Sequence, residues 1–108
     1  MRYEILGGPD DGRIIMTSKR SIAIGRSRED DLWLYYDLTV ARHHLLITHT
    51  GTSFTATDAG KDGKGSKNGT YLNERNEQSC FRNAEVPIKP GDTLYVGRIG
   101  IKLLGETQ

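Results

Sequence analysis

Turn-forming residues are followed directly by strand-forming ones in Gly65-Ser66-Lys67-Asn68-Gly69-Thr70-Tyr71-Leu72-Asn73. The first half of this stretch favours a tight turn, because glycine adopts positive φ angles without steric cost and asparagine tolerates them. Residues 70–72 combine a β-branched, an aromatic and an aliphatic side chain, which is typical of a short strand. The stretch therefore predicts a loop that leads directly into a β-strand.

The same succession of short strand and turn runs along the whole chain. Turns are favoured at Pro9-Asp10-Asp11-Gly12 and at Lys89-Pro90-Gly91-Asp92, where proline fixes φ and glycine relaxes it. No long window shows the helical period of about 3.6 residues. We therefore predict an all-β fold, a two-sheet antiparallel β-sandwich of about ten or eleven short strands. The expected strands span residues 2–6, 12–17, 21–25, 32–34, 44–48, 53–57, 70–72, 85–88, 93–96 and 100–104.

Length and charge narrow the class of protein. The 108 residues are close to the commonest size of one domain, so we expect a single domain over residues 1–108. Its core should lie between about residues 3 and 104. The formal net charge is +1, and no global field therefore draws the chain to nucleic acid or to a membrane. Cys80 is the single cysteine and no apolar signal region follows Met1, so we expect a cytoplasmic protein.

The glycine-rich residues 59–67 superficially resemble nucleotide-binding and calcium-binding loops. A P-loop needs its last glycine to be followed by Lys and then by Ser or Thr, whereas Gly65 is followed by Ser66 and Lys67. An EF-hand needs a bidentate Glu where this chain has Gly69. We therefore interpret residues 60–64 as a mobile loop between two strands, and we expect no cofactor.

Histidines and carboxylates form no recognisable metal-binding or catalytic set. His43 and His44 are neighbours on an expected strand, so their side chains should point to opposite faces and cannot chelate one ion. Glu29-Asp30-Asp31 is the only acidic cluster, and adjacent carboxylates in a turn are typical of a solvated entry to a strand. We therefore expect no metal site and no enzymatic activity.

Basic residues stand at the ends of expected strands. They occur in Ile24-Gly25-Arg26-Ser27, in Val40-Ala41-Arg42-His43-His44 and around Lys67-Asn68. Loops at one pole of a sandwich lie close together, so side chains that are distant in sequence can meet there. Arginine offers phosphate a planar fork of donors, and lysine adds a further donor group. The sequence therefore predicts anion-binding loops at one end of the sandwich.

Together with Gly91-Asp92-Thr93-Leu94-Tyr95-Val96-Gly97, these motifs resemble the forkhead-associated (FHA) domain in their order and spacing. The family pattern is Gly-Arg, Ser-Arg-x-His, Ser-(Thr or Lys)-Asn-Gly-Thr and Gly-Asp. The similarity extends from Tyr3 to Leu104 and is that of a bacterial-type, single-domain member with Ala41 in place of the motif serine. It implies a non-catalytic module that recognises phosphothreonine peptides in Ser/Thr kinase signalling.

The resemblance also implies roles for individual residues. Arg26 would contact the phosphate, Arg42 would lie beside it, Lys67 would face it, and Asn68 would bind the backbone of the ligand peptide. Two further candidates for ligand binding are Thr39 and Ser27. The residues expected to support the loops are Gly25, His44, Gly69 and Thr70.

Ala41 leaves two functions open. Its methyl group cannot donate to phosphate, although the hydroxyl of Thr39 or the charge of Lys67 could substitute for the missing serine. The first function is recognition of a phosphothreonine-containing protein. The alternative is a phosphate-independent protein–protein interaction or self-association module on a degenerate FHA fold. Domains of this family are often fused to others, so we also expect a possible fusion partner domain in a longer native chain.

Overall fold

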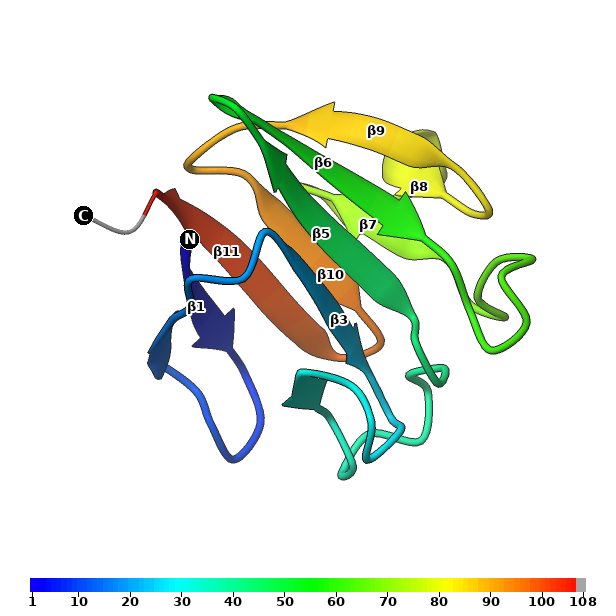
Figure 1. Ribbon diagram of the computed structural model, residues 1–108. Helices are drawn as coiled ribbons and strands as arrows, with labels where there is room; N and C mark the ends of the chain where they lie inside the picture. The colour runs from blue at the N-terminus through cyan, green and yellow to red at the C-terminus, as the bar shows by residue number, and fades with distance from the viewer. Residues whose placement is uncertain (107–108) are drawn as a thin grey trace.

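The chain folds into two β-sheets that pack face to face (Figure 1). The structure is a computed structural model and describes residues 1–106. One sheet has the strand order β2-β1-β11-β10-β7-β8 and the other β4-β3-β5-β6-β9. A single 3-10 turn, η1 (Glu77–Ser79), is the only helical element of the described residues. The strands are β1 (Arg2–Leu6), β2 (Ile14–Met16), β3 (Ser21–Gly25), β4 (Leu32–Trp33), β5 (Leu45–Thr50), β6 (Ser53–Asp58), β7 (Thr70–Leu72), β8 (Cys80–Phe81), β9 (Glu85–Ile88), β10 (Thr93–Val96) and β11 (Ile99–Gly105).

The structure confirms the predicted β-sandwich and changes some of its details. Each predicted strand is present, but residues 12–17 shrink to β2 and residues 44–48 shift to β5. The pair β3–β4 is parallel, which departs from the antiparallel expectation. Strand β8 was not predicted, because a two-residue strand has no periodicity and exists only through its pairing with β7. No helix of the described residues is long and apolar enough to cross a membrane.

The core lies between the sheets because inward-facing positions alternate along each strand. In β5, Leu45 and Ile47 are fully buried, while their neighbours Leu46 and Thr48 are only half-buried. Strand β11 faces them from the other sheet with its own buried aliphatic residues. Each fully buried side chain of this kind stabilises the fold by about 1.5–3 kcal/mol. The buried core therefore stabilises the strands from which the loops extend.

Strand register places three loops at one end of the sandwich. Leu45, at the start of β5, pairs with Ile24 near the end of β3 and with Asp58 at the end of β6. The segments that follow β3, precede β5 and follow β6 therefore emerge side by side (Figure 1). The turn between β10 and β11 reaches the same end, because Arg98 donates its main-chain N–H to Asp37 in the segment before β5. The predicted convergence of loops is thus confirmed.

Candidate functional site

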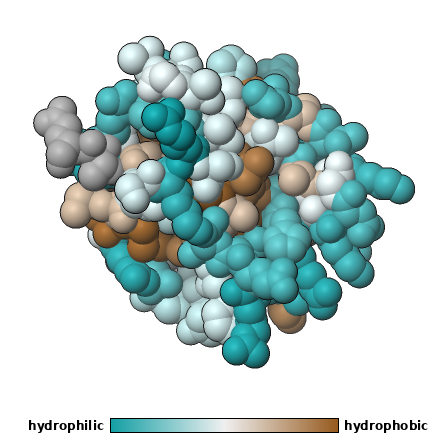
Figure 2. All heavy atoms as spheres, in the orientation of Figure 1, coloured by the Kyte–Doolittle hydropathy of each residue, from teal (hydrophilic) through white to brown (hydrophobic). Residues whose placement is uncertain are grey.

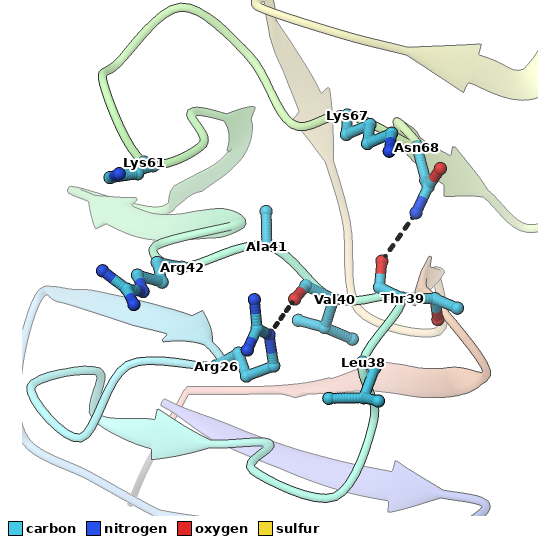
Figure 3. A pocket seen from close by; sticks show the side chains of 9 residues that line it. All are labelled: Arg26, Leu38, Thr39, Val40, Ala41, Arg42, Lys61, Lys67 and Asn68. Atoms are coloured by element: carbon cyan, nitrogen blue, oxygen red, sulfur yellow. Dashed lines mark hydrogen bonds between the residues drawn. The ribbon is translucent and has the colours of Figure 1, made fainter.

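A cavity of about 300 Å³ opens among these loops (Figure 3). None of its lining side chains is acidic, whereas four are cationic. Hydrophilic side chains also gather over the lower right of the molecule in Figure 2, where Figure 1 places the loops that follow β3 and β6. The cavity is lined by Arg26, Leu38, Thr39, Val40, Ala41, Arg42, Lys61, Lys67 and Asn68.

Arg26 is held in place by the segment between β4 and β5. Its Nε donates to the carbonyl oxygen of Val40 at 3.0 Å, and its main-chain N–H donates to that of Ala41 at 3.1 Å. Gly25 permits this approach, because a Cβ atom there would lie 2.5 Å from both Asp30 Oδ2 and the main-chain nitrogen of His43. The Nη groups of Arg26 point toward Ala41 in Figure 3 and have no hydrogen-bond partner among the described residues. They are available to an anion.

Asp30 is a buried carboxylate that ties two loops together. It accepts hydrogen bonds from the main-chain N–H of Ser27 at 2.9 Å and of His43 at 3.1 Å. Its other oxygen lies 2.5 Å from His43 Nδ1. The interpretation of residues 29–31 as a solvated entry to a strand was therefore wrong for Asp30. Ser27 belongs to the same loop as Asp30, but His43 comes from a different loop, and no local sequence pattern reveals that second partner.

The two adjacent histidines do not lie together on a strand as predicted. β5 begins at Leu45, and His43 occupies a turn with a φ of 49°. Their side chains do go to different places, since His43 contacts Asp30 while His44 is fully buried. The structure therefore corrects the predicted conformation of this dipeptide. Among residues 1–106 there is no cluster of three or more His, Cys, Asp or Glu side chains able to hold a metal ion.

His44 connects two of the loops that line the cavity. Its Nδ1 accepts from the main-chain N–H of Ala41, and its Nε2 donates to the carbonyl oxygen of Gly69, both at 2.9 Å. These partners require the ring to be neutral, with its proton on Nε2. Burial lowers the pKa of His44, while the bond to Gly69 and the nearby Asp58 act in the opposite direction. The ring therefore remains a neutral brace.

Asp58 fixes the turn that carries Lys67 and Asn68. It accepts from the main-chain N–H and the hydroxyl of Ser66, from Thr70 Oγ1 at 2.7 Å and from the N–H of Asn83 at 3.1 Å. Burial alone would raise the pKa of Asp58, but these hydrogen bonds together lower it. Ser66 Oγ in turn accepts from the N–H of Gly69. Sequence reasoning missed Asp58, whose donors come from three segments.

The predicted ligand-binding residues do not all meet. Asn68 is exposed, and its Nδ2 donates to the carbonyl oxygen of Thr39 at 2.9 Å, which leaves its Oδ1 free to accept. Thr39 lines the cavity, but its hydroxyl lies 2.5 Å from Asp37 Oδ1 and donates there. Ser27 lies outside the cavity lining, and its Oγ accepts from the N–H of Glu29. Arg26, Arg42, Lys67, Asn68 and Thr39 thus converge, together with the unpredicted Lys61.

The chain is thus a β-sandwich with a cationic cavity built from loops at one end. The FHA domain family model matches residues 22–97. The chain therefore belongs to the FHA domain family. The comparison with curated protein sequences found no match.

Solved structures agree with this assignment. An FHA domain from a structural and functional analysis of phosphothreonine-dependent FHA domain interactions is 26% identical, with a TM-score of 0.72 over 94% of this chain and 91% of that one. The FhaA FHA domain, complexed with the intracellular domain of Rv3910, is 25% identical to this chain. Its TM-score is 0.71, and the match covers 94% of this chain and 96% of that one. An FHA domain of an Arabidopsis thaliana hypothetical protein is 22% identical, with a TM-score of 0.79 over 99% and 86%, and shares the fold.

Replacement of Asp58 by Asn should destabilise the protein strongly. The substitution removes the charge that several buried donors share and places amide hydrogens against them. We expect Asp58→Asn to lower the free energy of unfolding by roughly 2–4 kcal/mol in urea denaturation. The control Asp62→Asn changes an exposed carboxylate nearby and should stay within about 0.5 kcal/mol of the original protein. Equal effects of the two substitutions would contradict the role given to Asp58.

The lowered pKa of His44 should make stability depend on pH. In the unfolded chain the ring takes up a proton as the pH falls below its usual pKa of 6.5. In the folded state the pKa is lower, so the ring stays neutral to a lower pH. The contribution is therefore present above that value and is lost as the pH falls below it. Between about pH 7.5 and about pH 5.5, urea denaturation should show a loss of up to about 1.4 kcal/mol that His44→Gln lacks. The same pH dependence in both proteins would refute a neutral brace.

Proposed function

We propose that this chain binds a phosphothreonine-containing segment of a partner protein at the cationic cavity. The observation that carries the proposal is the convergence of Arg26, Arg42, Lys61 and Lys67 on one cavity that no carboxylate lines. A phosphothreonine carries about −1.5 to −2 charges at neutral pH and three acceptor oxygens. The cavity offers the complementary charge and donors.

Arg26 is the side chain best prepared to bind the phosphate. The hydrogen bond from its Nε to the carbonyl oxygen of Val40 orients the guanidinium before any ligand arrives, and the main-chain bond to Ala41 fixes the backbone beneath it. Less side-chain entropy is then lost on binding. A fixed guanidinium can offer two parallel N–H groups to phosphate, and each charge-assisted hydrogen bond contributes about 1.5–3 kcal/mol.

Asn68 is suited to reading the backbone of the ligand. Its Nδ2 is held by the carbonyl oxygen of Thr39, which orients the amide, and its exposed Oδ1 can accept from a peptide N–H. The same hydrogen bond joins the loop after β6 to the segment before β5. Phosphate and peptide backbone would therefore be read by loops that are already connected.

The missing serine is compensated by charge in this proposal. Ala41 presents only a methyl group, and the hydroxyl of Thr39 is engaged with Asp37. Thr39 would have to break this bond to donate to phosphate. Lys67 has no such commitment, because it is exposed and lines the cavity. We therefore assign the compensating role to Lys67, and not to Thr39.

Similarity to a domain with phosphothreonine-dependent interactions, and to another solved with an intracellular partner domain, supports a signalling role. Domains of this family are generally binding modules without catalysis. We therefore propose that residues 1–108 act as one non-catalytic module that reads the products of a Ser/Thr kinase in the cytoplasm. A fusion partner in a longer chain is compatible with this role.

Exposed aromatic and aliphatic side chains favour a second candidate, a phosphate-independent protein interaction. Trp33, Tyr35 and Leu38 are 42%, 58% and 82% exposed, and they lie in one segment. The rings of Trp33 and Tyr35 are in contact, with centroids 5.1 Å apart. Aromatic residues are enriched at protein interfaces. Leu38 also lines the cationic cavity, so one partner could contact both surfaces.

Calorimetric titration of a phosphothreonine peptide library should separate the two candidates. We expect micromolar binding that requires the phosphate and weakens by about 10- to 150-fold in Arg26→Ala, because a charge-assisted contact is lost. The matched control is Arg28→Ala, since Arg28 is exposed in the same loop, stacks over Trp33 and lies outside the cavity. It should bind like the original protein. Binding that is equally tight without the phosphate and is weakened by Arg28→Ala would favour the second candidate instead.

A further inference from the structure

Lys61 lies in the cavity lining although the sequence analysis placed it in the loop of residues 60–64 and not among the ligand-binding residues. It comes from the glycine-rich segment between β6 and β7, whose base is fixed by main-chain hydrogen bonds. Ala59 donates to the carbonyl oxygen of His44 at 3.0 Å, and Gly60 donates to that of His43 at 2.9 Å. The segment interpreted above as a mobile loop is thus anchored at its start, directly before Lys61.

Gly60 makes this placement possible. Its φ is 75°, and a Cβ atom there would lie 2.1 Å from the carbonyl oxygen of Gly65. No other residue type could occupy the position without moving the backbone. The chain therefore turns back on itself at Gly60, and the hydrogen bond from Gly65 N–H to the Ala59 carbonyl oxygen closes the turn. Lys61 is carried to the cavity by local backbone geometry.

The cations are divided between two sides of Ala41. Figure 3 shows Arg42 and Lys61 on one side, Lys67 and Asn68 on the other, and Arg26 directed toward Ala41 from below. All of them line the same cavity. The position that a serine would occupy between the two sides holds a methyl group, which offers no hydrogen bond to a single central phosphate.

A single phosphate does not neutralise the positive charge of this cavity. Its charge of about −1.5 to −2 offsets about half of the positive charge on the four side chains. Two phosphates would carry about −3 to −4 in total and match it. A carboxylate would add only one negative charge and lacks the third oxygen of a phosphate. The charges and their division thus favour a second phosphate over an acidic side chain.

We propose that the cavity binds a doubly phosphorylated segment. The phosphothreonine would bind Arg26 and Lys67, and a second phosphorylated residue close to it in sequence would bind Arg42 and Lys61. This inference rests on the proposed function and specifies its ligand. It also gives Lys61 the role of a specificity-determining residue.

Peptide titrations at one fixed salt concentration test the inference, since salt screens exposed charges. The peptides carry a phosphothreonine alone, or with a phosphoserine stepped along the flanking positions, or with glutamate in place of that phosphoserine. An unphosphorylated copy completes the set. The proteins are the original chain, Lys61→Ala and Lys64→Ala. Lys64 is a matched control, because it is exposed in the same loop but lies outside the cavity lining.

We expect the best doubly phosphorylated peptide to bind the original protein at least about 10-fold more tightly than the singly phosphorylated one, as one further charge-assisted contact allows. Lys61→Ala should reduce this preference to about threefold or less, whereas Lys64→Ala should retain it. The glutamate peptides should gain clearly less than the phosphoserine peptides.

Three results would overturn the inference: no gain from a second phosphate, an equal gain from glutamate, or an equal loss of preference in both lysine variants. If the singly phosphorylated peptide still binds in a phosphate-dependent way, the proposed function survives these failures. If no phosphorylated peptide binds better than the unphosphorylated copy, both proposals fail together.

Discussion

The binding loops of this domain depend on two buried side chains, His44 and Asp58. The neutral ring of His44 spans from the Ala41 N–H to the Gly69 carbonyl oxygen, and Asp58 gathers donors from Ser66, Thr70 and Asn83. The two side chains approach each other, with His44 Nε2 3.7 Å from Asp58 Oδ2. An unpaired buried carboxylate or imidazole would cost stability, so the loops are held in the arrangement that satisfies both.

This scaffold explains how like charges can be kept together. Arg26, Arg42, Lys61 and Lys67 repel one another around an unliganded cavity, which opposes any loose arrangement that collects them. Apart from the bond that Arg26 Nε makes to Val40, the hydrogen bonds that collect them are made by main-chain groups and by uncharged or acidic side chains underneath. The anion binding proposed above would relieve this repulsion without first ordering the loops. The fold thus supplies the organisation of the loops, and the four cationic side chains supply their positive charge.

The sequence predicted those parts of the structure that depend on neighbouring residues in the chain. Strand-forming runs and turn residues predicted the sandwich, and strand ends placed Arg26, Arg42, Lys67 and Asn68 at one pole. It was uninformative where partners are distant, as for Asp30 and Asp58, whose donors meet only in the folded chain. Lys61 could not be predicted because its place depends on the turn at Gly60, and the hydroxyl of Thr39 was found to be engaged by Asp37.

The most direct test of the central claim is NMR mapping of main-chain amide shifts during titration with a phosphothreonine peptide. The account predicts that the largest changes fall on the amides of Arg26, Ala41, Arg42, Lys67 and Asn68, which belong to the loops around the cavity. The hairpin between β5 and β6, at the opposite end of these strands, should not respond. Changes centred on Trp33 and Tyr35 that also occur with the unphosphorylated peptide would contradict the account.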